Sequence, residues 1–225
     1  MKIPNAIERL FEEWEAKDRR QPVAVAWDLN VWKRQFDPHS EEISFLSELP
    51  AQLTRDDGES FGNDATTSAD SARKAFLYSM AWGFGTTNYG AWRTKQILTA
   101  NSDAYERLFV CAQTVANEGS VEGYRFLANE GRLKWFGPAF GTKFLYFCSV
   151  NEPQARALVL DRLVGDWLAR STDLKINPTR WSTAAYKGFL DQMRNWSHAL
   201  DLAPDQLEAL IFEDERRRKS EQSSD

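Results

Sequence analysis

The chain has 225 residues, a formal net charge of −5, 42% hydrophobic residues and 27% charged residues. This balance is typical of a folded globular protein, and it excludes both a disordered chain and a protein that coats nucleic acid by bulk positive charge. The two cysteines lack metal-ligand spacing, and two histidines are too few for a His-rich zinc site. No apolar run reaches the ~18 residues of a membrane span, so we expect no membrane partner and a cytoplasmic location.

The N-terminal part of the chain is predicted to hold little regular structure. An apolar stripe predicts a helix over 7–20, which ends before Pro22. The stretch 23–36 is ambiguous between strand and helix. Residues 38–70 are polar and predict a long loop, with at most one short helix over 41–49.

Apolar residues at helical spacing predict a succession of helices from Ser71 onward, with a Gly-rich run over 83–90. These predicted helices cover 71–82, 92–98, 102–116, 120–129, 142–150, 152–169, 179–200 and 204–219. The predicted fold class is therefore mostly α. We divide the chain into an N-terminal segment over 1–70, a helical core over 71–200 and a C-terminal helix and tail over 201–225, packed as one integrated domain.

A Gly/Pro turn opens onto a predicted helix at Phe136-Gly-Pro-Ala-Phe-Gly-Thr-Lys143. Such a turn leaves backbone N–H groups at the positive end of the helix dipole, where a phosphate can bind. A turn of this kind can also be purely structural. Asp161 follows 18 residues after Lys143, inside an apolar run. A carboxylate buried there needs a partner or a task, although it could also cap a helix.

This hairpin with its later aspartate resembles the helix-hairpin-helix DNA glycosylases, in particular the 8-oxoguanine DNA glycosylase/lyases. The similarity covers about 71–200, and it extends to bacterial stand-alone proteins of this fold found beside anti-phage signalling operons. The resemblance implies a two-lobed, mostly α helix-hairpin-helix fold and double-stranded DNA as the partner. It implies no required cofactor and no metal site, and it allows for a monovalent cation at the hairpin and for defence-operon partners.

The resemblance gives Lys143 and Asp161 catalytic roles. The Lys143 amine attacks C1′ of a flipped-out nucleotide, expels the base and leaves a Schiff base that permits strand cleavage. Asp161 stabilises the positive charge on the sugar and assists proton transfer. We expect burial and the helix N-terminus to favour the free amine of Lys143. The function implied is a bifunctional DNA glycosylase/AP lyase for an oxidised purine such as 8-oxoguanine.

Further site residues follow from the same resemblance. Phe147, four residues after Lys143, is predicted to form one wall of the base pocket. Gln192 and Trp196, also four residues apart, are predicted to read the base edge and stack on it. The remaining candidates are Trp82 and Trp181 as walls, each of which could instead be core, and Gly137, Gly141, Thr142 and Arg162 as DNA-phosphate contacts.

The acidic net charge leaves room for a local basic face. The hairpin carries Arg132 and Lys134, and later segments add Lys175, Arg180, Lys187 and Arg194, whereas acids balance the run 216–219. Two other functions stay open: a catalytically inactive helix-hairpin-helix DNA-binding or interaction module, and a glycosylase-fold enzyme acting on another nucleobase substrate. The Lys143/Asp161 pair after the hairpin favours the enzyme over the binding module.

Overall fold

The computed structural model describes residues 3–19, 24–151 and 155–222. Within these ranges the chain is mostly helical, with one two-stranded antiparallel sheet, which confirms the predicted fold class. The elements in chain order are α1 (Asn5–Glu15), β1 (Val25–Ala26), α2 (Leu29–Lys33), α3 (Glu41–Ser47), β2 (Gln52–Leu53), α4 (Arg55–Asp64), α5 (Ala69–Phe84), α6 (Asn88–Ala100), α7 (Ala104–Glu118), α8 (Ser120–Ala128), α9 (Pro138–Cys148), α10 (Arg162–Ser171), α11 (Thr183–Ala199) and α12 (Pro204–Gln222). Among these helices, none is both long and apolar enough to cross a membrane.

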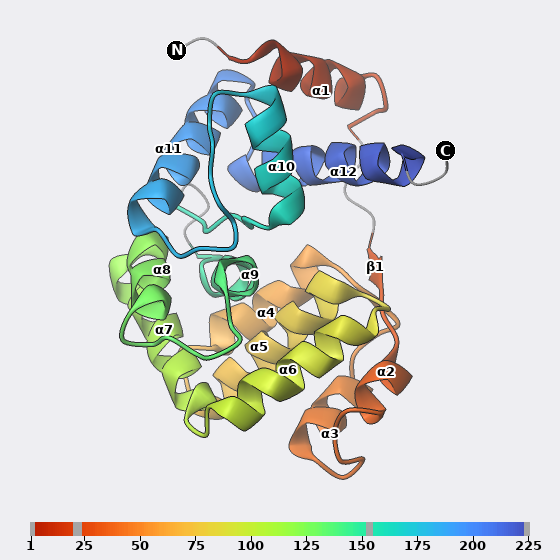
Figure 1. Ribbon diagram of the computed structural model, residues 1–225, viewed down its shortest axis with the longest axis vertical. Helices are drawn as coiled ribbons and strands as arrows, with labels where there is room; N and C mark the ends of the chain where they lie inside the picture. The colour runs from red at the N-terminus through yellow and green to blue at the C-terminus, as the bar shows by residue number, and fades with distance from the viewer. Residues whose placement is uncertain (1–2, 20–23, 152–154, 223–225) are drawn as a thin grey trace.

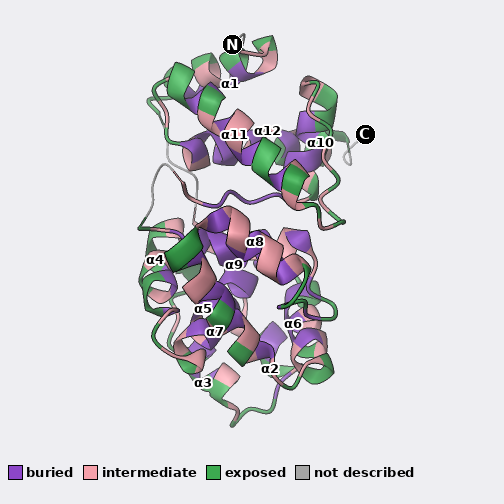
Figure 2. Cartoon of the chain, turned by 90° about the vertical axis from the view of Figure 1, so that its left-hand side faces the viewer, coloured by how far each residue is buried: buried purple, intermediate pink, exposed green. Residues whose placement is uncertain are grey.

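The helices form two lobes (Figures 1 and 2). One lobe holds α1, α10, α11 and α12, and the other holds the helices from α2 to α9. Helix α9 lies at the centre of the molecule, packed on α4, α5 and α8, while α8 also packs on α11 of the other lobe. Both terminal segments belong to these lobes, because α4 packs on α5 and α9 and α12 packs on α10 and α11.

The predicted loop over 38–70 is wrong, because this stretch contains α4 as well as α3. Thr54 caps α4 by accepting the Asp57 N–H, and the Asp57 carboxylate accepts the Thr54 N–H in return. Gly58 and Gly62 let the helix lie directly against α9, since a Cβ on Gly62 would stand 1.8 Å from the Phe147 carbonyl oxygen. Tertiary packing thus forms a helix from residues whose own helix propensity is low.

The predicted helix over 152–169 begins later than expected, at Arg162. Residues 156–160 are extended and run beside α9, and their backbone groups are bound by side chains of the core. Ser149 and Thr142 accept the N–H groups of Ala157 and Leu160, and the Tyr186 hydroxyl donates to the Leu158 carbonyl. Residues 152–154 of this prediction lie outside the described residues.

Candidate active site

Helix α9 carries Lys143 into the interior of the molecule. The helix begins with Pro138 at its first position, after Gly137 as the N-cap, and its residues from Gly141 to Cys148 are all buried. The Lys143 side chain is only 8% exposed, and its aliphatic stem runs past Gly83 of α5. A Cβ on Gly83 would stand 2.6 Å from the Lys143 Cδ atom, so the glycine makes room for the lysine.

Asp161 meets this lysine from the start of α10. Its Oδ2 atom accepts a hydrogen bond from the Lys143 Nζ atom at 2.9 Å. Its Oδ1 atom accepts the N–H groups of Leu163 and Val164 at 3.0 and 3.2 Å, which caps the helix. The sequence left open whether Asp161 has a charged partner or caps a helix. The carboxylate does both, because Oδ2 binds Lys143 and Oδ1 caps α10.

The surroundings of Asp161 favour its ionised form. Burial raises the pKa of the carboxyl, but the charge and hydrogen bond of Lys143 and the N–H groups of Val164 and Leu163 outweigh it, so the pKa lies below its ordinary value. The free amine of Lys143 stays a prediction, and the structure places its Nζ atom at ion-pair distance from this carboxylate. A nucleophilic Lys143 requires this pair to give up a proton from Nζ.

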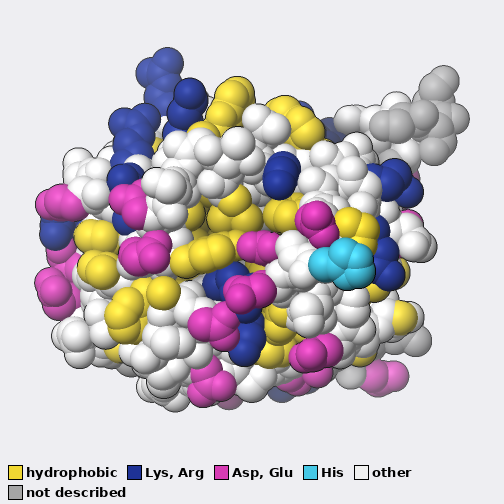
Figure 3. All heavy atoms as spheres, turned by 90° about the horizontal axis from the view of Figure 1, so that it is seen from below, with side chains coloured by type: hydrophobic (Ala, Val, Ile, Leu, Met, Phe, Trp, Pro, Cys, Tyr) yellow, Lys and Arg dark blue, Asp and Glu magenta, His cyan; other side chains and the backbone are white. Residues whose placement is uncertain are grey.

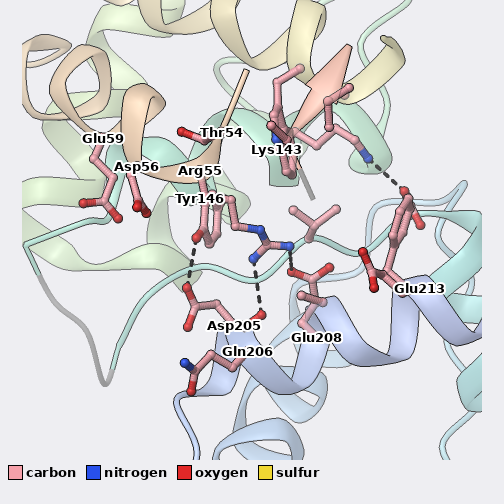
Figure 4. Close-up of a pocket in the computed structure, with 18 of the residues that line it drawn as sticks. Thr54, Arg55, Asp56, Glu59, Lys143, Tyr146, Asp205, Gln206, Glu208 and Glu213 are labelled. Carbon is pink, nitrogen blue, oxygen red and sulfur yellow. Dashed lines mark hydrogen bonds and ion pairs between the residues drawn. The ribbon is translucent and has the colours of Figure 1, made fainter. Parts of the chain in front are cut away.

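Lys143 and Asp161 both line a cavity of about 510 Å³ between the two lobes (Figure 4). Helices α4, α5, α9 and α12 and the segment before α10 contribute its walls. Six carboxylate side chains and three cationic ones line it: Asp56, Glu59, Asp161, Asp205, Glu208 and Glu213, with Arg55, Lys143 and Arg216. The cavity is thus large enough for a nucleobase and a sugar, and its interior does not favour phosphate.

One wall of the cavity combines two aromatic rings with an arginine. The Trp82 and Tyr146 rings are nearly parallel, with 9° between their planes and 6.3 Å between their centroids. The Arg55 guanidinium carbon lies 4.7 Å from the Tyr146 centroid and 5.5 Å from that of Trp82. This wall offers a flat, apolar and cationic surface of the kind on which a base stacks.

Helix α12 holds this wall in place. Arg55 donates to the Glu208 carboxylate at 2.8 Å and to the Asp205 carbonyl at 3.3 Å, and the Tyr146 hydroxyl donates to the Asp205 carboxylate at 2.9 Å. Burial raises the pKa of the Glu208 carboxyl, and the Arg55 charge only partly offsets that rise. Burial likewise raises the pKa of the Tyr146 hydroxyl. The polar side of the cavity is therefore a buried network rather than a set of free charges.

The structure brings only some of the predicted base-binding residues to the cavity. Trp82 lines it, whereas Phe147, Gln192, Trp196 and Trp181 do not. Phe147 is 0% exposed and lies behind Trp82, whose ring it meets edge-on with 5.4 Å between centroids. The predicted wall is corrected to a core position, because the unforeseen α4 covers this part of α9.

The other two aromatic side chains and the amide of that prediction lie elsewhere. Gln192 and Trp196 belong to α11, and Trp196 is buried. Trp181 packs on Tyr124, with 4.8 Å between centroids, and covers Gly141. None of the three lines the cavity, so their predicted contact with a base is not supported by their positions.

Two of the predicted phosphate contacts are engaged within the protein. A Cβ on Gly141 would stand 2.5 Å from the Trp181 ring, and the Gly141 N–H donates to the Gly137 carbonyl. The Thr142 hydroxyl accepts the Leu160 N–H. The predicted phosphate role of Gly141 and Thr142 is therefore corrected to one in packing and in positioning Asp161. Gly137 has open space beside its Cα atom, and Arg162 is exposed.

The sequence did not indicate the cavity residues Arg55, Tyr146, Asp205 and Glu208. One signal for Arg55 was present, because it follows Thr54 in a Thr-x-x-Asp sequence that is typical of a capped helix start. Tyr146 is three residues after Lys143, which places it beside Lys143 on a helix. No local pattern brings Asp205 and Glu208 here, since they come from the last helix of the chain.

Basic side chains are distributed unevenly. The run Arg216–Lys219 is paired with carboxylates, as the sequence predicts for a solvated helix end. Lys187 and Arg194 both pair with Asp191. Five exposed cations near the hairpin and the α10–α11 connection form no ion pair with any described residue: Arg132, Lys134, Arg162, Lys175 and Arg180. On the face that Figure 3 shows, one group of Lys and Arg side chains stands at the upper left, and others lie scattered among carboxylates.

Among the described residues, no group of three or more histidine, cysteine, aspartate or glutamate side chains is arranged to hold a metal ion. No curated protein and no solved structure matches the chain. A family model described as "Putative 8-oxoguanine DNA glycosylase OGG-like protein" matches residues 18–212, which include the hairpin, Lys143, Asp161 and every helix from α2 to α11. The chain belongs to this family of 8-oxoguanine DNA glycosylase OGG-like proteins.

Proposed function

We propose that this protein is a DNA glycosylase and AP lyase that removes an oxidised purine such as 8-oxoguanine through a Schiff base on Lys143. The observation that carries the proposal is the contact of 2.9 Å between Lys143 Nζ and Asp161 Oδ2 at the wall of a cavity of about 510 Å³. A buried amine beside a carboxylate is the pair that nucleophilic attack on a sugar carbon requires. Family membership supports DNA as the substrate.

The chemistry starts with a nucleotide flipped into the cavity, its base against Trp82 and Arg55. Asp161 accepts a proton from the Lys143 ammonium along their hydrogen bond. The freed electron pair on Nζ forms a bond to C1′ while the C1′–N bond breaks, and its electrons leave with the base. The proton on Asp161 then passes to the departing base nitrogen, which leaves a carboxylate beside the positive charge now on Nζ.

Strand cleavage follows from the same covalent link. The C1′–O4′ bond then breaks while one Nζ proton passes through Asp161 to O4′, and the electron pair on Nζ forms a protonated imine with C1′. Loss of a proton from C2′ then sends an electron pair toward C3′, and the 3′ phosphate leaves. Lys143 thus supplies both the nucleophile and the electron sink, and Asp161 is the group placed to move the protons.

Docking of DNA is assigned to the exposed cations around the hairpin, since the cavity itself is rich in carboxylates. Arg132, Lys134 and Arg162 stand outside it without ion pairs to described residues. Each phosphate contact adds salt-dependent affinity by counterion release. A modest basic edge is enough for an enzyme that scans duplex DNA.

Borohydride trapping tests the proposal. The protein is incubated with labelled duplexes that carry 8-oxoguanine, uracil or an abasic site, and sodium borohydride reduces any imine to a stable adduct. We expect an adduct with the 8-oxoguanine and abasic duplexes, and none for Lys143→Gln. Lys187→Gln, which changes an exposed lysine paired only with Asp191, is the matched control and should trap normally.

Two results would change the conclusion. Tight binding of all duplexes without any adduct would make the protein a DNA-binding module. An adduct with the uracil duplex but not with the 8-oxoguanine duplex would support the same lysine chemistry with uracil as the excised base.

We also propose a role in anti-phage defence, which the resemblance implies. A plaque assay tests it: cells that carry Lys143→Gln should lose the protection that the wild-type protein gives.

A further inference from the structure

Five aromatic rings form a continuous arc on the surface beside the hairpin. They are joined in the order Phe140, Phe84, Tyr89, Trp92 and Trp135, with centroid separations of 5.2, 5.5, 5.7 and 6.3 Å between neighbours. The rings come from α5, α6, α9 and the turn before α9. Gly90 permits the packing of Phe84, since a Cβ there would stand 2.5 Å from the Phe84 side chain.

Arg93 of α6 lies in the middle of this aromatic arc. Its guanidinium carbon is 5.2 to 5.9 Å from the centroids of four of the five rings, those of Phe140, Trp135, Tyr89 and Trp92. Its Nε atom is buried and has no hydrogen-bond partner, and the side chain forms no ion pair with any described residue. The arc therefore carries a positive charge that no carboxylate of the described chain neutralises.

The arc is open to solvent at its middle ring, Tyr89, and at its last ring, Trp135. Tyr89 and Trp135 are 46% and 44% exposed, and they are two of the three large hydrophobic residues that stand exposed among the described residues. Trp135 holds a left-handed backbone conformation, with φ at 71°, which costs energy for a side chain of its size. The exposed part of the Trp135 ring is therefore available for contact with a ligand.

The surroundings of the arc indicate which ligand. Arg132 and Lys134, which form no ion pair with any described residue, lie three residues and one residue before Trp135. Phe84, the second ring of the arc, is separated in the sequence only by Gly83 from Trp82, which lines the cavity. Flat rings, a guanidinium and flanking cations are the combination that binds the unpaired bases and the phosphates of single-stranded nucleic acid.

We propose that the aromatic arc is a second nucleobase-stacking site, which holds an unpaired base of a DNA strand outside the cavity. The inference rests on the proposed function only in taking DNA as the ligand, and it needs no chemistry at Lys143. It predicts that the protein binds single-stranded DNA by its bases as well as by its phosphates. A site that bound DNA by positive charge alone would have the same affinity for a strand with bases and for one without them.

The test is fluorescence anisotropy with two labelled 12-residue probes, an oligothymidine and an oligomer of abasic sites with the same phosphates. We expect wild-type protein to bind the oligothymidine at least tenfold more tightly than the abasic probe. Trp135→Ala and Tyr89→Ala should each weaken oligothymidine binding about tenfold and leave the abasic probe unaffected. Val110→Ala is the matched control, because Val110 is 43% exposed on α7 and is not part of the arc.

Equal affinity of the wild-type protein for both probes would overturn the proposal, as would unchanged oligothymidine binding in Trp135→Ala. Self-association that Trp135→Ala abolishes without any change in DNA affinity would identify the arc as an interface between copies and also overturn it. The proposed function fails separately, since absence of a borohydride adduct leaves the oligothymidine result untouched.

Discussion

Gly83 lies on α5 and Lys143 on α9, and the Lys143 side chain passes through the space that a side chain on Gly83 would occupy. The Lys143 stem occupies the space that a Cβ on Gly83 would fill, 2.6 Å from Cδ and 2.8 Å from Cε. The lysine is therefore guided past α5 to Asp161, with its Nζ atom held at 2.9 Å from the carboxylate. A glycine in the wall of the cavity thus positions the proposed nucleophile.

Gly83→Ala tests this positioning. The added methyl group forces the Lys143 stem aside, and a displacement of about 1 Å can cost about 100-fold in rate. We expect single-turnover base excision to fall by 10- to 100-fold, while affinity for duplex DNA stays unchanged. Gly188→Ala is the control, because a Cβ there meets nothing within 4 Å on α11, and its excision rate should equal that of the wild type.

The Lys143–Asp161 pair predicts a specific pH dependence of stability. The folded-state pKa of Asp161 lies below the ordinary value of 3.8, so the carboxylate contributes stability above pH 3.8 that is lost as the pH falls through the folded pKa. Asp161→Asn removes this contribution. Its free energy of unfolding, measured by urea titration between pH 5 and pH 2, should therefore fall less steeply with acidification than that of the wild type. Parallel curves would show that the pair does not stabilise the fold.

Phe147→Ala distinguishes a core residue from a pocket wall. Because the ring is wholly buried against α4 and Trp82, its removal should lower the free energy of unfolding by about 3–5 kcal/mol. Phe147→Leu keeps most of the volume and should leave the ratio of excision rates on 8-oxoguanine and uracil duplexes unchanged. A changed ratio of these excision rates in a stably folded Phe147→Leu variant would show that Phe147 lines the base pocket.

Because Arg55 and Glu208 form a buried ion pair, replacing one of them should destabilise the protein more than replacing both. Arg55→Met leaves Glu208, which is 1% exposed, without its partner, and should destabilise the protein by about 3–5 kcal/mol at neutral pH. Arg55→Met with Glu208→Leu removes both charges and should recover most of that loss. A double variant as unstable as the single one would show that other contacts of Arg55, such as that with Tyr146, dominate.

The sequence predicted the centre of the site because its geometry is largely local. Lys143 follows the hairpin turn directly, and Asp161 heads the next described helix, so two short segments suffice to bring them together. The base-binding residues depend instead on long-range packing. Gly58 and Gly62 are poor helix formers, and α4 forms because it packs on α9. That packing buries Phe147 and brings Arg55 to the cavity, which no local pattern around either residue shows.

The extended segment before α10 has the same explanation. Its apolar residues form a continuous run, whose pattern does not distinguish a helix from a buried strand. Its conformation is decided by partners far away in the sequence, namely Thr142, Ser149 and Tyr186. A helix through this stretch would have left Asp161 in mid-helix, whereas the extended segment leaves it free at the N-cap to face Lys143.

The most direct test of the central claim is the identity of the residue that carries the sugar. Wild-type protein is reacted with an 8-oxoguanine duplex in borohydride, the adduct is digested with nuclease and protease, and the modified peptide is sequenced by mass spectrometry. We expect a reduced deoxyribose fragment on Lys143 and on no other lysine. A fragment on a different amine, or excision of the base with no adduct anywhere, would contradict it.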